Sequence, residues 1–567
     1  MDKKDVARGL EEIAGFLELK GENPFRIRAY RTAARAVATL PGELSKALSS
    51  GALAEVKGVG PAILEIVREL VTTGRSRVLE DLRDEVPPGL VEMLQISGLG
   101  VTKVRQIHEA LHVERLAELE EAARDGRLAQ LPRFGKKTTE NILKGIDFLR
   151  QATGFRLFHH ARTEAVALAE VLRTMPGVRR VAIAGSVRRH AEIIRDLDFV
   201  VELDGSAGPL VERLGAAPGV REFVSKTERT ITLRFGSGTV ADIYLAPRER
   251  FGFELIRATG SAEHLKQLAE RARSRGLAWD TGLAGCEEAE VYRELGLDSI
   301  PAELREGQGE VEAAAAGRLP ALVVRSDLVG FLHCHTNYSD GTTTVAEWAD
   351  AVRAAGYEWM GITDHSQSSA YAGGLRAEDV TRQHAEIDAA NRRSGDFRVL
   401  KGVEADILAD GALDYGPAVL DRFDFVIASI HTRFGMTEAE MTERVLRALD
   451  DRRTTILGHP TGRLLLSREP YAIDLERVLQ RAADRGVAIE VNADPHRLDL
   501  DWRMVRRARE LGVSMSLGAD AHSVAGMANV ALGVGIARKG WLAARDVLNT
   551  RDAEGFLAHA RRRPAYA

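Results

Sequence analysis

Nine histidine and carboxylate side chains in the C-terminal part of the chain have the residue types that bind metal ions. They are His333, His335, Asp340, His365, Glu404, His431, His459, Asp520 and His522. Nearly every one lies where a short apolar run ends, as in Trp359–His365. Loops at the carboxyl ends of barrel strands converge on one site, so ligands that are distant in sequence can meet. The pattern predicts a site for two or three ions, and metal-bound hydroxide attacking a phosphoester is its natural chemistry.

Three aspartates in the middle of the chain indicate a second metal centre. Asp196 and Asp198 are two residues apart on a predicted strand and so share a face, and Asp242 lies in another predicted strand. Three clustered carboxylates repel one another unless cations lie between them. Two Mg²⁺ ions that bridge a hydroxyl group and a triphosphate would supply this charge, and in-line phosphoryl transfer is the reaction they serve.

A short motif upstream of these aspartates suits a triphosphate. Gly185 and Ser186 precede Arg188 and Arg189, and together they offer a hydroxyl group, backbone N–H groups and guanidinium groups. Charge-assisted hydrogen bonds from such donors bind β- and γ-phosphates. An Asp-x-Asp pair alone often caps a turn or faces water, but this motif at this spacing favours catalysis.

Two similar turns in the N-terminal region each precede a predicted helix. The turns are Gly58-Val59-Gly60 and Gly98-Leu99-Gly100. A Gly-x-Gly turn that opens a helix points backbone N–H groups at one spot, which suits a phosphate. This helix-hairpin-helix signature binds the DNA backbone without reading bases, and Lys103 adds positive charge beside the second turn. A plain connecting turn is the alternative for a single copy, and the second copy disfavours it.

The elements that must position the nine C-terminal ligands are seven apolar runs that alternate with predicted helices such as Val345–Ala355 and Leu475–Arg485. The runs are Gly330–His335, Trp359–His365, Arg398–Glu404, Asp424–His431, Thr455–His459, Ala488–Asn492 and Ser514–His522. This alternation predicts a parallel sheet buried on both faces and closed into a barrel-like α/β domain. Strands are also expected at Val181–Ala184, Asp198–Leu203, Thr230–Phe235 and Thr239–Leu245, whereas residues 1 to about 150 are expected to be helical.

Composition limits the classes of protein that the chain can be. Its 567 residues exceed one core and predict several domains. A net charge of −5 argues against nonspecific coating of nucleic acid, although Lys20–Arg35 is a local basic patch. Two cysteines, Cys286 and Cys334, suit a reducing compartment, and no apolar run is long enough for a signal or membrane segment. We expect a soluble cytoplasmic monomer with no membrane partner.

Together these motifs resemble a family X DNA polymerase, of the DNA polymerase β type, followed by a polymerase and histidinol phosphatase (PHP) domain. The polymerase likeness rests on Gly185–Arg189, the three aspartates, Thr259-Gly260-Ser261 and both turns. The PHP likeness rests on His-x-His at 333–335, Asp364-His365, Glu404, His431, Gly458-His459-Pro460 and Asp520-Ala521-His522. This order is the layout of bacterial family X polymerases, and the resemblance covers essentially the whole chain.

The resemblance implies a role for each motif. Asp196, Asp198 and Asp242 would be catalytic and bind two Mg²⁺ ions. A deoxynucleoside triphosphate would contact Gly185, Ser186, Arg189, Thr259, Gly260 and Ser261. Both turns and Lys103 would bind gapped or primed DNA, and the nine C-terminal ligands would bind two to three Mn²⁺ or Zn²⁺ ions. The implied function is the filling of short gaps with 3′-5′ exonuclease or related 3′-end processing, in DNA repair of the base excision type.

The implied fold is multidomain, with α/β and α+β parts. A lyase-like helical domain with the first hairpin would span residues 1–80, and a second helix-hairpin-helix subdomain would span 81–150. A nucleotidyltransferase palm with a mixed sheet would follow at 151–250, and a nucleotide- and nascent-pair-binding subdomain at 251–305. A distorted (β/α)7 PHP barrel would span 325–567. Residues 306–324 are rich in Glu, Gly and Ala without an apolar period, and we expect a linker there.

Several positions depart from the family pattern. Arg257-Ala258 stand where vertebrate polymerases have an aromatic pair, which leaves ribonucleotide discrimination open. Leu265 and Ala269 replace the Asn and Arg that would contact the minor groove. Ile66 stands at the place of the lyase lysine, and an alkyl side chain cannot form a Schiff base. We therefore expect the N-terminal domain to bind a 5′ phosphate without lyase chemistry.

Neighbours of the barrel ligands are assigned other roles. His333 and His335 share a strand face, so Cys334 on the opposite face is expected to pack rather than to bind metal. Asp364 is expected to orient a neighbouring ligand. His384 and His496 lie off the pattern and are assigned no metal.

Two other functions remain open from the sequence. One is a PHP phosphatase fused to a nucleotidyltransferase with a non-DNA substrate, for which two hairpin turns would have no use. The other is a DNA-binding module without catalysis, which the complete aspartate triad disfavours and the altered positions near Thr259 favour.

Overall fold

The computed structural model describes residues 3–38, 40, 44–56, 59–94, 96, 98–217, 219–236 and 238–561. The chain divides into two compact units. The first is Met1–Thr153 together with the short segments His335–Thr344 and Leu466–Glu469, and the second is Gly154–Cys334, Val345–Leu465 and Pro470–Ala567. Within the described parts of the chain, no helix is both long and apolar enough to cross a lipid bilayer.

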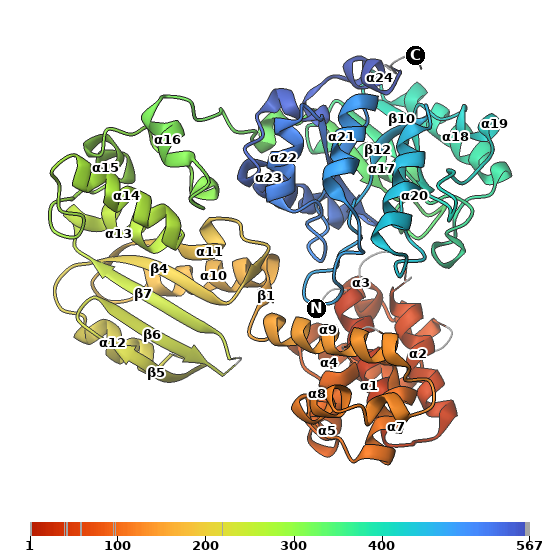
Figure 1. The fold of residues 1–567 in the computed structure, drawn as a ribbon, viewed down its shortest axis with the longest axis horizontal. Helices are drawn as coiled ribbons and strands as arrows, with labels where there is room; N and C mark the ends of the chain where they lie inside the picture. Colours follow the sequence, from red (N-terminus) through yellow and green to blue (C-terminus); the bar gives the residue numbers. More distant parts are fainter. Residues whose placement is uncertain are drawn as a thin grey trace. The chain divides into compact units, whose positions relative to one another are not determined.

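The first unit is helical throughout its regular described elements, drawn from red to orange in Figure 1. The helices are α1 (Lys3–Leu19), α2 (Pro24–Ala38), α3 (Leu44–Ser49), α4 (Pro61–Thr73), α5 (Arg77–Glu85), α6 (Pro88–Leu94), α7 (Val101–Leu111), α8 (Leu116–Arg124) and α9 (Lys136–Ala152). Apolar residues recur at helical spacing, as Val6, Leu10, Ile13 and Leu17 do in α1, and these faces are buried in one core. The two predicted helices after the glycine turns therefore form as α4 and α7.

The second unit begins with a five-stranded mixed sheet, as counted over its described residues (Figure 1). Its strands are β2 (Val178–Ile183), β4 (Asp196–Leu203), β7 (Val240–Ala246), β6 (Thr230–Phe235) and β5 (Val220–Lys226), in spatial order. Only the β4–β7 pair is parallel among these neighbours. Helix α10 (Phe158–Arg173) contributes Phe158, Ala161 and Ala165 to the core on the sheet. The sequence did not predict β5, because most residues of this edge strand are exposed and give no apolar period.

Helices α11 (Gly185–Arg188) and α12 (Gly208–Gly215) lie between strands of the sheet in the chain and contribute Val187, Leu210 and Leu214 to its core. A smaller helical layer follows the sheet and contains α13 (Phe251–Thr259), α14 (Ala262–Ser274) and α15 (Glu288–Glu294). Phe253, Ile256, Leu268 and Tyr292 are buried in a core of their own.

Residues 306–324 differ from the linker that their composition predicts. They contain helix α16 (Glu310–Ala315), whose Val311 and Ala314 are buried in the same apolar cluster as Trp541. The Glu310 carboxylate accepts hydrogen bonds from the backbone N–H groups of Gly307 and Gln308. A helix of so few residues is too short to show an apolar period in the sequence.

The stretch 238–561 is described without a gap, and within it seven parallel strands close into a barrel (Figure 1, green to blue). The strands are β8 (Gly330–Cys334), β9 (Trp359–Ile362), β10 (Arg398–Asp406), β11 (Phe425–Ser429), β12 (Thr454–Leu457), β13 (Ala488–Asn492) and β14 (Met515–Ala521). The helices are α17 (Val345–Ala354), α18 (Ala377–Arg393), α19 (Pro417–Leu420), α20 (Glu438–Asp450), α21 (Leu475–Arg485), α22 (Trp502–Glu510), α23 (Val530–Lys539) and α24 (Ala553–Arg561). Nearly every strand residue is buried, as expected for parallel strands covered on both faces.

Candidate active sites

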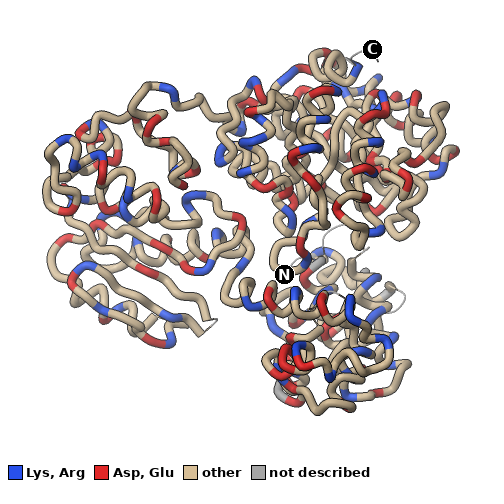
Figure 2. The backbone as a smooth tube through the Cα atoms, viewed as in Figure 1, with Lys and Arg blue, Asp and Glu red and all other residues tan. Residues whose placement is uncertain are grey.

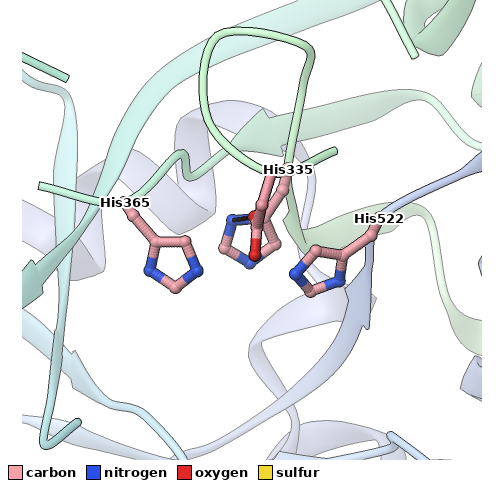
Figure 3. Close-up of side chains that lie close together, drawn as sticks. His335, His365 and His522 are labelled. Carbon is pink, nitrogen blue, oxygen red and sulfur yellow. Dashed lines mark ion pairs between the residues drawn. The ribbon is translucent and has the colours of Figure 1, made fainter. Parts of the chain in front are cut away.

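The nine predicted barrel ligands come together at the carboxyl ends of the barrel strands. Their ligand atoms form four overlapping groups, in each of which all atoms lie within 4.8 Å of one another. The groups are His335, Asp340, His365 and His522; His333, Glu404 and His459; His333, His335 and Asp520; and His365, Glu404 and His431. In Figure 3 the rings of His335, His365 and His522 converge on one space. Overlapping groups of histidine and carboxylate donors suit several divalent ions that share ligands.

Glu404 is the shared carboxylate at the centre of this cluster. Its oxygens lie 2.9 Å from Nδ1 of His365, 2.8 Å from Nε2 of His459 and 3.3 Å from Nε2 of His431. Burial alone would raise the pKa of Glu404, but the histidines outweigh burial and hold its pKa well below the usual range. Burial likewise lowers the pKa of His431, yet Glu404 and Asp406 outweigh it and raise that pKa to about 9. The buried carboxylates therefore need positive charge beside them, which is what bound cations supply.

Two buried carboxylates that the sequence did not single out contact residues of the predicted ligand set. Glu490 on β13 bonds to Nδ1 of His333, and its Oε2 accepts from the backbone N–H of His459 at 2.7 Å. Asp406 on β10 lies 2.5 Å from Nδ1 of His431. A carboxylate on the far ring nitrogen fixes the orientation and tautomer of a metal-binding histidine. Asp364, which is expected to orient a neighbouring ligand, accepts from Nε2 of Gln383 at 2.5 Å.

Three ligand residues adopt a backbone conformation that is uncommon outside glycine. His333, His459 and Asp520 have φ values of 59°, 23° and 47°. Such conformations cost about 1–3 kcal/mol each and persist where the surrounding structure enforces them, often at functional sites. Cys334 between two ligands is buried, and its Sγ donates to the carbonyl oxygen of Gly361 at 3.5 Å, which is a packing position.

The three central aspartates lie at one end of the parallel β4–β7 pair. Asp198 pairs in register with Asp242, and Asp196 lies two residues earlier on the same strand. Burial first, and then Asp196 and Asp242, raise the pKa of Asp198 to about 7. The clustered charge is therefore unfavourable without cations, which fits a site for Mg²⁺.

The glycine of the upstream motif makes room for this carboxylate. Gly185 has a φ of +59°, and a Cβ atom there would lie 1.8 Å from Oδ2 of Asp198. The adjacent Ser186 has a buried Oγ for which the described residues provide no hydrogen-bond partner. A buried hydroxyl beside a carboxylate cluster is available to a ligand oxygen.

The two arginines of the motif have different partners. Arg188 binds both oxygens of Glu288, at 2.6 and 2.7 Å, and also donates to Oγ1 of Thr259 at 3.1 Å. Arg189 donates to the carbonyl oxygen of Thr259 at 2.6 Å and to Glu306 at 3.0 Å. The Thr259-Gly260-Ser261 segment is thus joined by hydrogen bonds to the Gly185–Arg189 motif. Ser261 also caps α14 by accepting a hydrogen bond from the backbone N–H of His264.

Comparisons with known proteins agree with both centres. The helix-hairpin-helix domain family matches residues 1–76, the SAM-like helix-hairpin-helix tandem family matches 90–147, and the PHP domain family matches 332–494. The DNA polymerase/3′-5′ exonuclease PolX of Bacillus subtilis is 36% identical over 573 residues, covering 98% of this chain and 99% of that protein. The chain belongs to the bacterial family X DNA polymerases with a PHP domain.

Other relatives match a smaller part of this family X polymerase. A probable phosphatase of Acetivibrio thermocellus is 33% identical over 28% of this chain and 63% of its own length. A probable phosphatase of Aliivibrio fischeri is 41% identical over 17% of this chain and 37% of its own length. Family membership implies dependence on divalent metal ions, and the helix-hairpin-helix domains imply DNA binding.

The hairpin turns of the family X polymerase place backbone rather than side chains at their surface. Gly60 and Gly100 are the N-caps of α4 and α7. Val59 and Leu99 are buried, so their side chains belong to the core. Lys103 donates to the carbonyl oxygen of Gly98 at 2.8 Å, while Gly58 lies outside the described residues.

The basic patch Lys20–Arg35 is partly neutralised by acidic neighbours. The ion pairs are Lys20–Glu85, Arg26–Glu22 and Arg31–Glu18. Acidic and basic residues also intermingle over the helical unit in Figure 2. The positive charge of the patch is therefore weaker than its sequence suggests.

Ile66 on α4, at the place of the lyase lysine, is buried.

Two further residues beside the barrel cluster gave no signal in the sequence. Arg497 lies 3.5 Å from Asp520, and its side chain is largely buried. Tyr371 is 69% exposed, yet its ring centroid lies 6.4 Å from those of both His365 and His431. A cation and an exposed aromatic ring thus lie at the edge of the metal-suited cluster.

Proposed function

We propose that the chain is a DNA-directed DNA polymerase that fills short gaps, and that its barrel degrades DNA from the 3′ end. The observation that carries the proposal is the in-register pair of Asp198 and Asp242, beside Gly185 and the buried Ser186 hydroxyl. A carboxylate pair next to hydroxyl and guanidinium donors is the combination that transfer from a triphosphate requires. A phosphatase fused to a small-molecule transferase would not need the helix-hairpin-helix regions.

In the polymerase centre, Asp196, Asp198 and Asp242 would hold two Mg²⁺ ions, which polarise the triphosphate and lower the pKa of the attacking hydroxyl. Ser186 and Arg189 would bind and orient the phosphates of the deoxynucleotide. Arg188 is held by Glu288, so its part is to fix the Thr259 segment, which with Gly260 and Ser261 would border the nucleotide.

In the barrel, the nine ligands would hold two or three Mn²⁺ or Zn²⁺ ions, which supply a hydroxide nucleophile at neutral pH. Arg497 is close enough to the cluster to bind the phosphodiester. Tyr371 would stack on the terminal base, because aromatic rings bind single-stranded ends without base preference. Gly98–Gly100 and Gly58–Gly60, with Lys103, would bind the DNA backbone. A monomer in the cytoplasm remains the expectation from the sequence.

The test separates the two activities in the full chain. Primer extension on gapped DNA with Mg²⁺ and deoxynucleotides should fall at least about a hundredfold in Asp198→Asn, because a metal ligand contributes several kcal/mol to the transition state. Release of nucleotides from a 3′ end in Mn²⁺ should be lost in His335→Ala and retained in Asp198→Asn. Extension by Asp198→Asn at a near-parental rate contradicts the polymerase assignment, and 3′ degradation by His335→Ala contradicts the nuclease assignment.

A further inference from the structure

Helix α23 of the barrel lies directly against the end of the Gly185–Arg189 motif in the polymerase part. Leu532, Gly535 and Lys539 are spaced by three and four residues and so share one face of this helix. Leu532 packs against the core of the mixed sheet, and a Cβ atom at Gly535 would lie 2.0 Å from Nδ1 of His190. His190 follows Arg189 in the chain, so the absence of a side chain at Gly535 lets the helix approach the motif closely.

Lys539 ends this helix as a buried cation, with 2% of its side chain exposed. Its Nζ donates to the backbone carbonyl oxygen of Arg189 at 3.1 Å and forms an ion pair with Glu306. The same Glu306 oxygen accepts from Nε of Arg189 at 3.0 Å. Glu306 therefore lies between two cations, one from the barrel and one from the polymerase motif.

The charges of Arg189, Glu306 and Lys539 decide how well Arg189 can attract a phosphate. Arg189, Glu306 and Lys539 together carry one net positive charge. Without Lys539, the Glu306 carboxylate would neutralise Arg189 alone, and the pair would carry no net charge. Burial would raise the pKa of Glu306, but Lys539 and Arg189 outweigh burial and keep its pKa below the usual value, so Glu306 is charged at neutral pH.

We propose that Lys539 of the barrel is a positioning residue of the polymerase's nucleotide site. It neutralises Glu306 and anchors the Arg189 backbone, which leaves the Arg189 guanidinium charge available to the incoming triphosphate. The inference rests on the proposed nucleotidyl transfer at this site. It means that the barrel contributes to polymerisation through α23, independently of its own metal ligands.

The experiment measures steady-state gap filling by the full chain as a function of deoxynucleotide concentration. Lys539→Met should raise the KM for the nucleotide roughly tenfold and leave kcat within about threefold, because a buried hydrogen bond to a charged group is lost. Arg538→Met is the matched control. Arg538 is the preceding residue on α23 and pairs with Glu303 at 2.6 Å, without a contact to Glu306 in the described hydrogen bonds. It should leave the KM within about twofold of the parental value.

A second substitution distinguishes a charge effect from loss of structure. The double variant Lys539→Met with Glu306→Gln again leaves one positive charge, so its nucleotide KM should return to within about threefold of the parental value. Glu306→Gln alone should give a KM no higher than the parental one, and it answers the question even if Lys539→Met does not fold. A double variant as poor as Lys539→Met, an unchanged KM in Lys539→Met, or an equal rise in Arg538→Met overturns the proposal.

The two proposals fail in different ways. If the parental chain does not extend primers, or if Asp198→Asn still extends them, then the polymerase assignment is wrong. If the parental chain extends primers and Lys539→Met has the parental KM, only the role of Lys539 is wrong. Degradation of a 3′ end in Mn²⁺ should stay within about twofold of the parental rate in Lys539→Met, which reports that the barrel is intact.

Discussion

Glu490 is a buried carboxylate that contacts two ligand residues of the barrel but belongs to none of the four ligand groups. It bonds to Nδ1 of His333, to the backbone N–H of His459 and, through Oε2, to Nδ2 of Asn492 at 3.1 Å. A carboxylate in this position would make His333 a stronger metal ligand and fix the ring nitrogen that faces the cluster. Glu490 would thus act on a bound metal ion through His333 rather than directly.

The first prediction is that Glu490→Gln weakens Mn²⁺ binding by roughly 10- to 100-fold, the usual effect of losing such a partner. Calorimetric titration of the full chain with Mn²⁺ measures this, and primer extension in Mg²⁺ should be unchanged. Glu443→Gln on α20 is a control, because this carboxylate is half exposed and pairs with Arg477. Unchanged Mn²⁺ affinity in Glu490→Gln would show that the contact is only structural.

Tyr371 is the second residue whose position predicts a measurable effect. Its exposed ring lies beside His365 and His431, where the base of a 3′-terminal nucleotide could stack. Stacking on an aromatic ring contributes about 1–3 kcal/mol per base. In assays of exonuclease activity, Tyr371→Ala should therefore raise the KM for single-stranded DNA about tenfold with little change in kcat. Tyr371→Trp should retain the parental KM, and equal loss in both variants would mean that the ring does not act by stacking.

At the scale of secondary-structure elements, Glu288 joins α15 to Arg188 of the Gly185–Arg189 motif and to Arg305. It binds Arg188 at 2.6 and 2.7 Å and Arg305 at 2.6 and 3.1 Å. Burial raises the pKa of Glu288, but the two arginines outweigh burial and lower the pKa to about 2. This carboxyl is therefore ionised in the folded protein at pH values where it would be protonated in the unfolded chain.

The third prediction follows from that difference in pKa. A carboxyl whose pKa falls on folding stabilises the fold above its unfolded pKa of about 4.3, and this stability is lost as the pH falls toward 2. Glu288→Gln should lower the free energy of unfolding at pH 7 by about 3 kcal/mol, because it leaves two arginines without their counter-ion. Unfolding followed by circular dichroism should show this deficit shrinking between pH 5 and pH 2. A deficit that is independent of pH would contradict the assignment.

The barrel could be predicted from the sequence because each strand is apolar and most of them end in a histidine or carboxylate. The nine candidate ligands followed from that arrangement, and the structure brings their side chains together in four overlapping groups. Glu490 and Asp406 could not be found in this way, since a single acidic residue in a buried strand has no periodic pattern and gains its meaning only from a partner on another strand. Helix α16 was missed for a related reason, because Val311 and Ala314 are buried by Trp541, far away in the sequence.

At the scale of the whole molecule, the predicted activities draw on separate apolar cores. The helical unit has one core, the mixed sheet carrying the aspartates has another, and the barrel has a third that includes Leu332, Trp359 and Phe425. Separate cores permit separate loss of activity, which is the basis for pairing Asp198→Asn with His335→Ala. The contact of α23 with Arg189 and Glu306 joins the barrel to the polymerase part, and we expect it to act on nucleotide affinity rather than on either metal centre.

The fourth prediction concerns metal and stability. An ion that binds only the folded barrel stabilises it by about 3 kcal/mol when its free concentration is a hundred times its Kd. Mn²⁺ should therefore raise the unfolding temperature of the barrel by several degrees in scanning calorimetry, and removal of the metal by a chelator should reverse this. The helices of residues 3–153 have their own core, and this stretch contains no member of the four ligand groups. Its unfolding transition should therefore not move. His335→Ala should abolish most of the shift, whereas Asp198→Asn should keep it. An equal shift in His335→Ala would mean that Mn²⁺ stabilises the protein from a site outside the nine ligands.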